Sequence, residues 1–120
     1  TQFVMILDAL QLRLLEKIRS DLAGYSVVRS TSPLDNRAIW LEIFAGGIHK
    51  GNSCQTLLKK LNINCKEVAG LGNDYNDIDF LDICAEAYLV ANAPVNLQRH
   101  YKLVRSDKEE GFTEFISKVL

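Results

Sequence analysis

The first 45 residues alternate between short apolar runs and one amphipathic segment. A continuous apolar run over residues 3–7 predicts a buried strand. Leucine and isoleucine then recur at helical spacing over residues 14–22, and Gly24 ends that pattern. Residues 25–30 and 38–44 are rich in β-branched and aromatic side chains, with turn-forming residues between them. This order of strand, helix, strand, strand predicts a small α+β unit whose last two strands form a hairpin.

From residue 46 onward, predicted strands alternate with short predicted helices. Three apolar segments predict strands, at residues 66–72, 87–91 and 102–106. Amphipathic segments predict a helix capped by Asn52 or Ser53 and further helices over residues 78–85, 94–100 and 112–119. Strands that alternate with helices are typical of a parallel, doubly wound sheet. We therefore expect an α/β fold in residues 46–120, preceded by the α+β unit of residues 1–45.

Composition narrows the function classes. The chain has 120 residues, 48% of them hydrophobic, and a formal charge of −1, so no basic field favours nucleic acid. No apolar run approaches the roughly 18 residues needed to span a membrane. Cys54, Cys65 and Cys84 have spacings that fit neither a disulfide framework nor a zinc site. We expect buried, reduced thiols and a cytoplasmic protein without nucleic-acid or membrane partners.

The most informative segment is the acidic stretch after the strand at residues 66–72. It continues Asn73-Asp74-Tyr75-Asn76-Asp77. In open α/β sheets, ligands bind outside the carboxyl ends of the strands, and hard oxygen ligands suit Mg²⁺. The alternative is that these side chains only cap the helix that follows. The residues alone leave both interpretations open.

Lys50 precedes the first predicted helix of this second part, in the run Ile48-His49-Lys50-Gly51. A lysine beside a helix N-terminus can hold phosphate, because its ammonium and the backbone N–H groups face the same anion. The alternative is an ordinary solvated lysine in front of a helix cap.

Together these segments carry a resemblance to a known family. The run KGNSCQTLLKKLNI resembles the lysine motif of the Cof-like branch of the haloacid-dehalogenase superfamily of phosphatases. GLGNDYNDIDFLDICAEAYLVANA resembles its acidic metal motif, and EEGFTEFI resembles its closing segment. The resemblance implies that residues 46–120 are the second half of a doubly wound, Rossmann-like core. Residues 1–45 resemble, more loosely, the tail of the α/β cap of this branch.

The resemblance also implies roles for particular residues. Lys50 would be the catalytic lysine, and Asp77 a Mg²⁺ ligand or a carboxylate that supports the ligands. Asn76 would orient the same site, and Asn92 would face the substrate phosphate. The family's first acidic ligand falls on Asn73, an amide that can coordinate Mg²⁺ but adds no charge. Asn73 and its neighbour Asp74 are therefore alternative metal ligands.

The family's D-x-D motif, which carries the aspartate nucleophile, has no counterpart at a suitable position. The sole D-x-D here is Asp77-Ile78-Asp79, inside the metal motif. Asp8 also follows an apolar strand, but Leu10 stands where the general acid would be. We interpret Asp8 as a helix cap, with Gln11 completing a capping box.

These observations predict the C-terminal portion of a Mg²⁺-dependent phosphomonoester hydrolase for a small phosphorylated metabolite such as a sugar phosphate. Its nucleophile would lie outside this chain, which begins at Thr1 without an initiator methionine. Half a core would leave a sheet edge exposed, so we expect a homodimer or a complementing N-terminal segment. The alternatives are a non-catalytic phosphate- or partner-binding module and, less favoured, a capless divergent phosphatase that uses Asp8.

Overall fold

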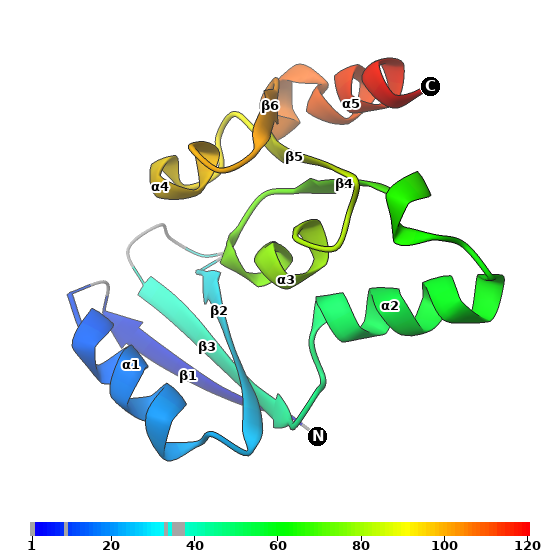
Figure 1. Cartoon of the computed structure of the whole chain (residues 1–120). Coiled ribbons are helices and arrows are strands. Elements are labelled where there is room, and N and C mark those ends of the chain that lie inside the picture. The colour runs from blue at the N-terminus through cyan, green and yellow to red at the C-terminus, as the bar shows by residue number, and fades with distance from the viewer. Residues whose placement is uncertain (1, 9, 33, 35–37) are drawn as a thin grey trace. The chain divides into compact units, whose positions relative to one another are not determined.

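The chain divides into two units, residues 1–49 and 50–120, in a computed structural model that describes residues 2–8, 10–32, 34 and 38–120 (Figure 1). Each unit has its own three-stranded sheet and its own buried cluster of apolar side chains. The boundary between the two units lies after residue 49, whereas the sequence pattern placed it after residue 45. That the first unit is part of a cap stays a prediction.

The first unit has the expected order of strand, helix, strand, strand. Its elements are β1 (Phe3–Asp8), α1 (Leu12–Asp21), β2 (Tyr25–Thr31) and β3 (Ala38–Ala45). The sheet order is β1-β3-β2, and both neighbouring pairs are antiparallel. The predicted hairpin of the last two strands is therefore confirmed.

Helix α1 covers one face of this sheet. Side chains alternate between the two faces of a strand, and Leu7, Ile39 and Leu41 share the face on which Leu15 of α1 packs. The prediction that residues 3–7 form a buried strand is wrong for most of its length, since Phe3 is 69% exposed and Leu7 alone is buried. Among its residues, Val4 and Ile6 point to the face of the sheet opposite α1, and Leu7 is the one that packs in the core under this helix.

The second unit contains the predicted parallel sheet, which confirms the α/β fold class. Its strands β4 (Ala69–Gly72), β5 (Glu86–Val90) and β6 (Lys102–Val104) pair in that order, all parallel. Its helices are α2 (Lys50–Leu61), α3 (Ile78–Leu81), α4 (Val95–Gln98) and α5 (Gly111–Val119). Short 3₁₀ turns cover Cys65–Glu67, Tyr75–Asp77 and Asp107–Glu109.

The core of the second unit lies on both faces of the central strand β5. Helices α3 and α5 lie on opposite sides of the sheet (Figure 1). Leu81 of α3 and Leu89 of β5 are almost completely inaccessible to solvent. On the other face, Tyr88 and Phe115 of α5 make an edge-to-face contact with ring centroids 5.4 Å apart. This packing on both faces explains the nearly continuous apolar run of β5.

Two helix predictions need correction. Helix α2 begins at Lys50, so Asn52 and Ser53 lie inside it and do not cap it. The helix expected over residues 78–85 is a single turn, because a 3₁₀ turn takes up the residues before it and β5 begins at Glu86. Across the described part of the chain, no helix combines the length and apolar character that crossing a membrane requires.

The prediction of buried thiols is wrong for Cys65, which is exposed in the 3₁₀ turn that follows α2. Cys54 and Cys84 are half-buried. Burial raises the pKa of the Cys84 thiol to about 11, and the Sγ atom lies 3.3 Å from the carbonyl oxygen of Phe80.

We predict that iodoacetamide at pH 8 alkylates Cys65 at least about tenfold faster than Cys84. The thiolate is the reactive form, and a raised pKa leaves little of it at this pH. Peptide mass spectrometry over a time course measures both rates. Equal rates would mean that Cys84 is more accessible than the structure indicates.

Candidate active site

The loop after β4 folds back tightly on its own strand. Gly72 ends β4, and a Cβ atom there would lie 2.8 Å from the Cβ of Asp77 and 2.9 Å from a methyl group of Leu81. Contacts this short do not occur between real side chains and their neighbours, so the position requires glycine. The glycine before the acidic motif thus lets the Asp77 side chain lie against the end of the strand.

Asp77 is the central group of this loop. Its side chain is 7% exposed, and its Oδ2 atom accepts hydrogen bonds from the backbone N–H groups of Asn73 (2.8 Å) and Asp74 (3.2 Å). Its Oδ1 atom lies 2.5 Å from the Nζ of Lys50. A buried carboxylate needs such partners, since an unpaired one would carry a large desolvation cost. Asp77 therefore holds both the loop and the lysine in place.

Lys50 reaches Asp77 because helix α2 approaches the loop closely. A Cβ atom at Gly51 would lie 2.5 Å from the backbone carbonyl oxygen of Asp79. The Lys-Gly pair therefore has a packing explanation: the glycine admits the close approach, and the preceding lysine makes the ion pair. Lys50 is ion-paired, and its side chain is still 51% exposed and accessible to a ligand.

The three other polar residues of the loop differ in their surroundings. Asp74 is buried, and its Oδ1 atom accepts the N–H of Tyr75 (2.8 Å), which confirms the capping interpretation for this residue. Asn73 is exposed, and Asn76 is half-buried. The structure therefore brings Lys50, Asn73, Asp74 and Asp77 together where β4 ends, with Asn76 in the same turn.

Asn92 follows β5, at the same end of the parallel sheet. Its Nδ2 atom donates to Oδ1 of Asp107 (2.9 Å), and its Oδ1 atom accepts the backbone N–H of Asp107 (3.2 Å). The hydroxyl of Tyr75 donates to Oδ1 of Asn96 (2.7 Å), which links the 3₁₀ turn after β4 to helix α4. Sequence reasoning missed Asn96 and Asp107, because nothing in a linear pattern pairs residues 15 and 21 positions apart.

Asp8 belongs to the first unit, at the end of the antiparallel strand β1. Its Oδ1 atom accepts the N–H of Leu10 (2.8 Å), and its own N–H donates to Oε1 of Gln11 (3.0 Å). The Gln11 half of the predicted capping box is present, but α1 begins at Leu12 and Gln11 occupies the cap position. Asp8 is thus a turn residue between strand and helix.

The oxygen atoms of this loop can be compared with the ligands that Mg²⁺ prefers. In the described ranges, no three His, Cys, Asp or Glu side chains gather into a metal-binding cluster. Both Asp77 oxygens are already engaged, and the buried Asp74 carboxylate accepts N–H groups of its own turn, while the Asn73 side chain beside the Lys50–Asp77 pair is exposed. These fit a Mg²⁺ ion that takes one or two protein oxygens and keeps its waters, and they do not form a protein cage.

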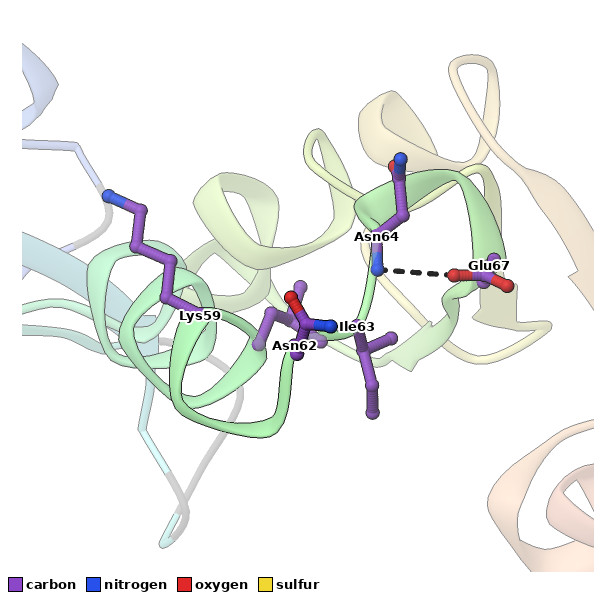
Figure 2. A pocket seen from close by; sticks show the side chains of 6 residues that line it. Lys59, Asn62, Ile63, Asn64 and Glu67 are labelled. Atoms are coloured by element: carbon purple, nitrogen blue, oxygen red, sulfur yellow. Dashed lines mark hydrogen bonds between the residues drawn. The ribbon is translucent and has the colours of Figure 1, made fainter.

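A surface hollow of about 470 Å³ lies at the opposite end of α2 from Lys50 (Figure 2). It is lined by Leu58, Lys59, Asn62, Ile63, Asn64 and Glu67. Glu67 accepts the backbone N–H of Asn64 (3.2 Å), so this carboxylate serves the turn that borders the hollow. None of the predicted site residues lines it, and it is separate from the candidate active site.

Comparison with known proteins gives the family. The family model for haloacid dehalogenase-like hydrolases matches residues 2–116, and the chain belongs to this family. A protein of Buchnera aphidicola that is named as a phosphatase is 26% identical over 82 residues, which are 66% of this chain and 30% of that protein. The chain spans about a third of the length of the curated relatives it matches.

Solved structures share the fold at low sequence identity. A haloacid dehalogenase-like hydrolase from B. subtilis has a TM-score of 0.79 at 18% identity, covering 98% of this chain and 41% of its own. A sugar phosphatase of subclass IIB of the superfamily has a TM-score of 0.78 at 14% identity, covering 98% and 42%. These structures share the fold, and the family model confirms the haloacid dehalogenase-like family inferred from the motifs.

We predict that Gly51→Ala lowers the free energy of unfolding of the second unit by about 1–2 kcal/mol. The added methyl group would meet the Asp79 backbone, and overpacking of this kind outweighs the gain in helix propensity. Urea unfolding followed by far-UV circular dichroism measures the change. Gly24→Ala is the matched control, since a Cβ there meets no atom within 4 Å. A Gly51→Ala variant as stable as the control would refute the close contact.

Proposed function

We propose that this chain is the C-terminal portion of a Mg²⁺-dependent phosphomonoester hydrolase that acts on a small phosphorylated metabolite such as a sugar phosphate. The observation that carries the proposal is the Lys50–Asp77 pair at the carboxyl end of a parallel sheet. A half-exposed ammonium fixed by a buried carboxylate is suited to bind a phosphoryl group without moving during the reaction. Family membership and the name of the sugar phosphatase with the same fold support the reaction class.

In this mechanism each residue has a limited task. Lys50 binds a phosphoryl oxygen and offsets the charge that develops there, and Asp77 keeps its ammonium in position. Asn92 donates an N–H to another phosphoryl oxygen, and Asn76 supports the loop. Bound Mg²⁺ would screen the charge between phosphate and nucleophile, with Asn73 and Asp74 as its ligands from this chain. The aspartate nucleophile would lie on a segment outside residues 1–120.

The proposal extends to the organisation of the whole protein. Residues 1–49 would be the tail of a cap and residues 50–120 the second half of the catalytic core, in agreement with curated relatives of which only about a third is matched. A preceding segment, or a second copy of the chain, would pair with an edge of the parallel sheet in residues 50–120. The protein would work in the cytoplasm on a small molecule.

A non-catalytic phosphate-binding module is the second candidate. Asn73 favours it, because an amide in the place of the family's first acidic ligand contributes no charge to a metal site. The hydrolase requires an aspartate nucleophile from a segment outside residues 1–120, whereas the phosphate-binding module requires none.

We predict that the 120-residue chain alone does not hydrolyse p-nitrophenyl phosphate, whereas the protein translated from the complete reading frame does so with Mg²⁺. In that protein, Lys50→Ala lowers kcat/KM by about 10²-fold or more, since it removes a charge that stabilises the transition state. Lys66→Ala, an exposed lysine in the turn after α2, is the control. Hydrolysis by the short chain that Asp8→Asn abolishes would support the capless phosphatase. A start codon directly before Thr1, with no hydrolysis, would support the non-catalytic module.

We predict that Asn73→Asp raises the affinity of the chain for Mn²⁺, used as a probe of the Mg²⁺ site, by about tenfold. A carboxylate adds the charge that the amide lacks. Paramagnetic broadening of the amide NMR signals of residues 72–77 during a Mn²⁺ titration measures the affinity without any need for catalysis. Gln55→Glu on α2 adds the same charge elsewhere and serves as the control. An equal effect of both variants would show that position 73 does not reach the ion.

A further inference from the structure

The backbone of the loop after β5 is fixed by hydrogen bonds on both sides of Asn92. The side chain of Gln98, on α4, donates to the carbonyl oxygens of Ala91 (2.9 Å) and Ala93 (2.7 Å). Ala93 is also buried in the core of the second unit, and its N–H donates to the carbonyl oxygen of Val90 (3.0 Å). The backbone around Asn92 is therefore held in place, and only the orientation of its side chain remains to be set.

Asp107, in the loop after β6, sets that orientation. Its Oδ1 atom accepts a hydrogen bond from Nδ2 of Asn92 (2.9 Å), and its backbone N–H donates to Oδ1 of Asn92 (3.2 Å). An ionised carboxylate can only accept and a backbone N–H can only donate, so these bonds determine where the amide nitrogen and the amide oxygen lie. Without such partners, the terminal torsion of an asparagine is broad and roughly two-fold, and either atom can face a ligand.

One N–H of Asn92 remains for a ligand. The Nδ2 group carries two hydrogens, and Asp107 accepts one of them. Among the residues that the structure describes, none accepts the second, and Asn92 is exposed. Asn92 follows β5, and ligands of open α/β sheets bind outside the carboxyl ends of the strands. A neutral donor with a fixed direction at this position suits an anionic oxygen.

We propose that Asp107 is a positioning residue for phosphate binding, which holds the Asn92 amide with its free N–H toward a phosphoryl oxygen and its carbonyl oxygen turned away. A freely rotating amide would bind phosphate more weakly, because its orientation would have to be fixed at the moment of binding. Asp107 itself does not contact the ligand. This inference rests on the proposed function in taking Asn92 as a phosphate-binding residue, and it adds the group that orients this residue.

The arrangement uses Asp107 as a hydrogen-bond acceptor and does not require its charge. A carboxylate near a phosphate is repulsive, because both are negative. An asparagine at position 107 could offer a carbonyl oxygen in the same place and would keep its backbone N–H. We therefore expect Asp107→Asn to preserve the orientation of Asn92 and Asp107→Ala to lose it.

The first experiment follows the two Nδ2 hydrogens of Asn92 by NMR while the 120-residue chain is titrated with inorganic phosphate. In the unmodified chain and in Asp107→Asn, we expect phosphate to shift the signal of the hydrogen that residue 107 leaves free. In Asp107→Ala, the same shift should need about tenfold more phosphate, the loss expected for one hydrogen bond. Asp82→Ala is the control and should bind phosphate like the unmodified chain. Asp82 is also exposed and accepts one side-chain hydrogen bond, from Tyr101 (2.7 Å), which precedes β6 and so lies at its other end.

The second experiment measures hydrolysis of p-nitrophenyl phosphate by the protein from the complete reading frame. We expect Asp107→Ala to lower kcat/KM about tenfold, again the loss of one hydrogen bond, and Asp107→Asn and Asp82→Ala to leave it unchanged. Urea unfolding of the same variants measures stability separately. A tie between loops that served stability alone would lower the free energy of unfolding and leave the phosphate titration of the folded chain unchanged.

Three results would overturn the inference. One is a phosphate titration in which Asp107→Ala and the unmodified chain respond alike. Another is an Asp107→Asn variant as impaired as Asp107→Ala, which would assign the effect to the charge of the carboxylate. The third is a pair of Asn92 signals that phosphate does not shift in any variant.

The outcome can be separated from that of the proposed function. If the protein from the complete reading frame hydrolyses phosphomonoesters and Asp107→Ala is as active as Asp82→Ala, the proposed function stands and the inference fails. If that protein hydrolyses no phosphomonoester while phosphate shifts the free Asn92 N–H in the chain and Asp107→Ala weakens this response, the proposed function fails and the positioning of Asn92 stands.

Discussion

The structure of the candidate site depends on the burial of one carboxylate. Asp77 can be buried only because an ammonium and two backbone N–H groups satisfy its oxygens. Those partners come from the first residue of α2 and from the loop after β4, so one side chain determines where both elements lie. Gly51 and Gly72 are required for the same reason, because a methyl group at either position would separate the elements that Asp77 joins.

The polar residues of the motif differ in how much hydrogen-bonding capacity this arrangement leaves them. A carboxylate that already accepts three hydrogen bonds is suited to hold a lysine, and it has little capacity left for a metal ion. Asp74 is partly used by the turn that it caps. Asn73 is the residue of the loop that is most open to a ligand, and it is uncharged. Helix α2 and the loop thus place a paired cation, Lys50, close to an exposed and uncharged amide, Asn73.

Much of the fold could be predicted from periodicity, since alternation of apolar segments identified all six strands and the parallel sheet. The failures share a physical cause, which is that tertiary contacts override local preference. Asn52 and Ser53 are good helix caps, but α2 begins earlier, at Lys50, where Gly51 packs on Asp79. The run over residues 3–7 has the composition of a core strand, yet only Leu7 of it packs in the core under α1. Family resemblance, rather than periodicity, predicted Lys50 and Asp77 as site residues.

The two units differ in how strongly their polar residues are constrained. In the second unit, Asp77 accepts two backbone N–H groups and lies against Gly72, so a change of side chain there disturbs the backbone itself. In the first unit, Trp40, Glu42 and Ser30 occupy positions defined only by alternation along paired strands. A substitution on the face that they share can alter its chemistry while the ladder of backbone hydrogen bonds and the core under α1 remain.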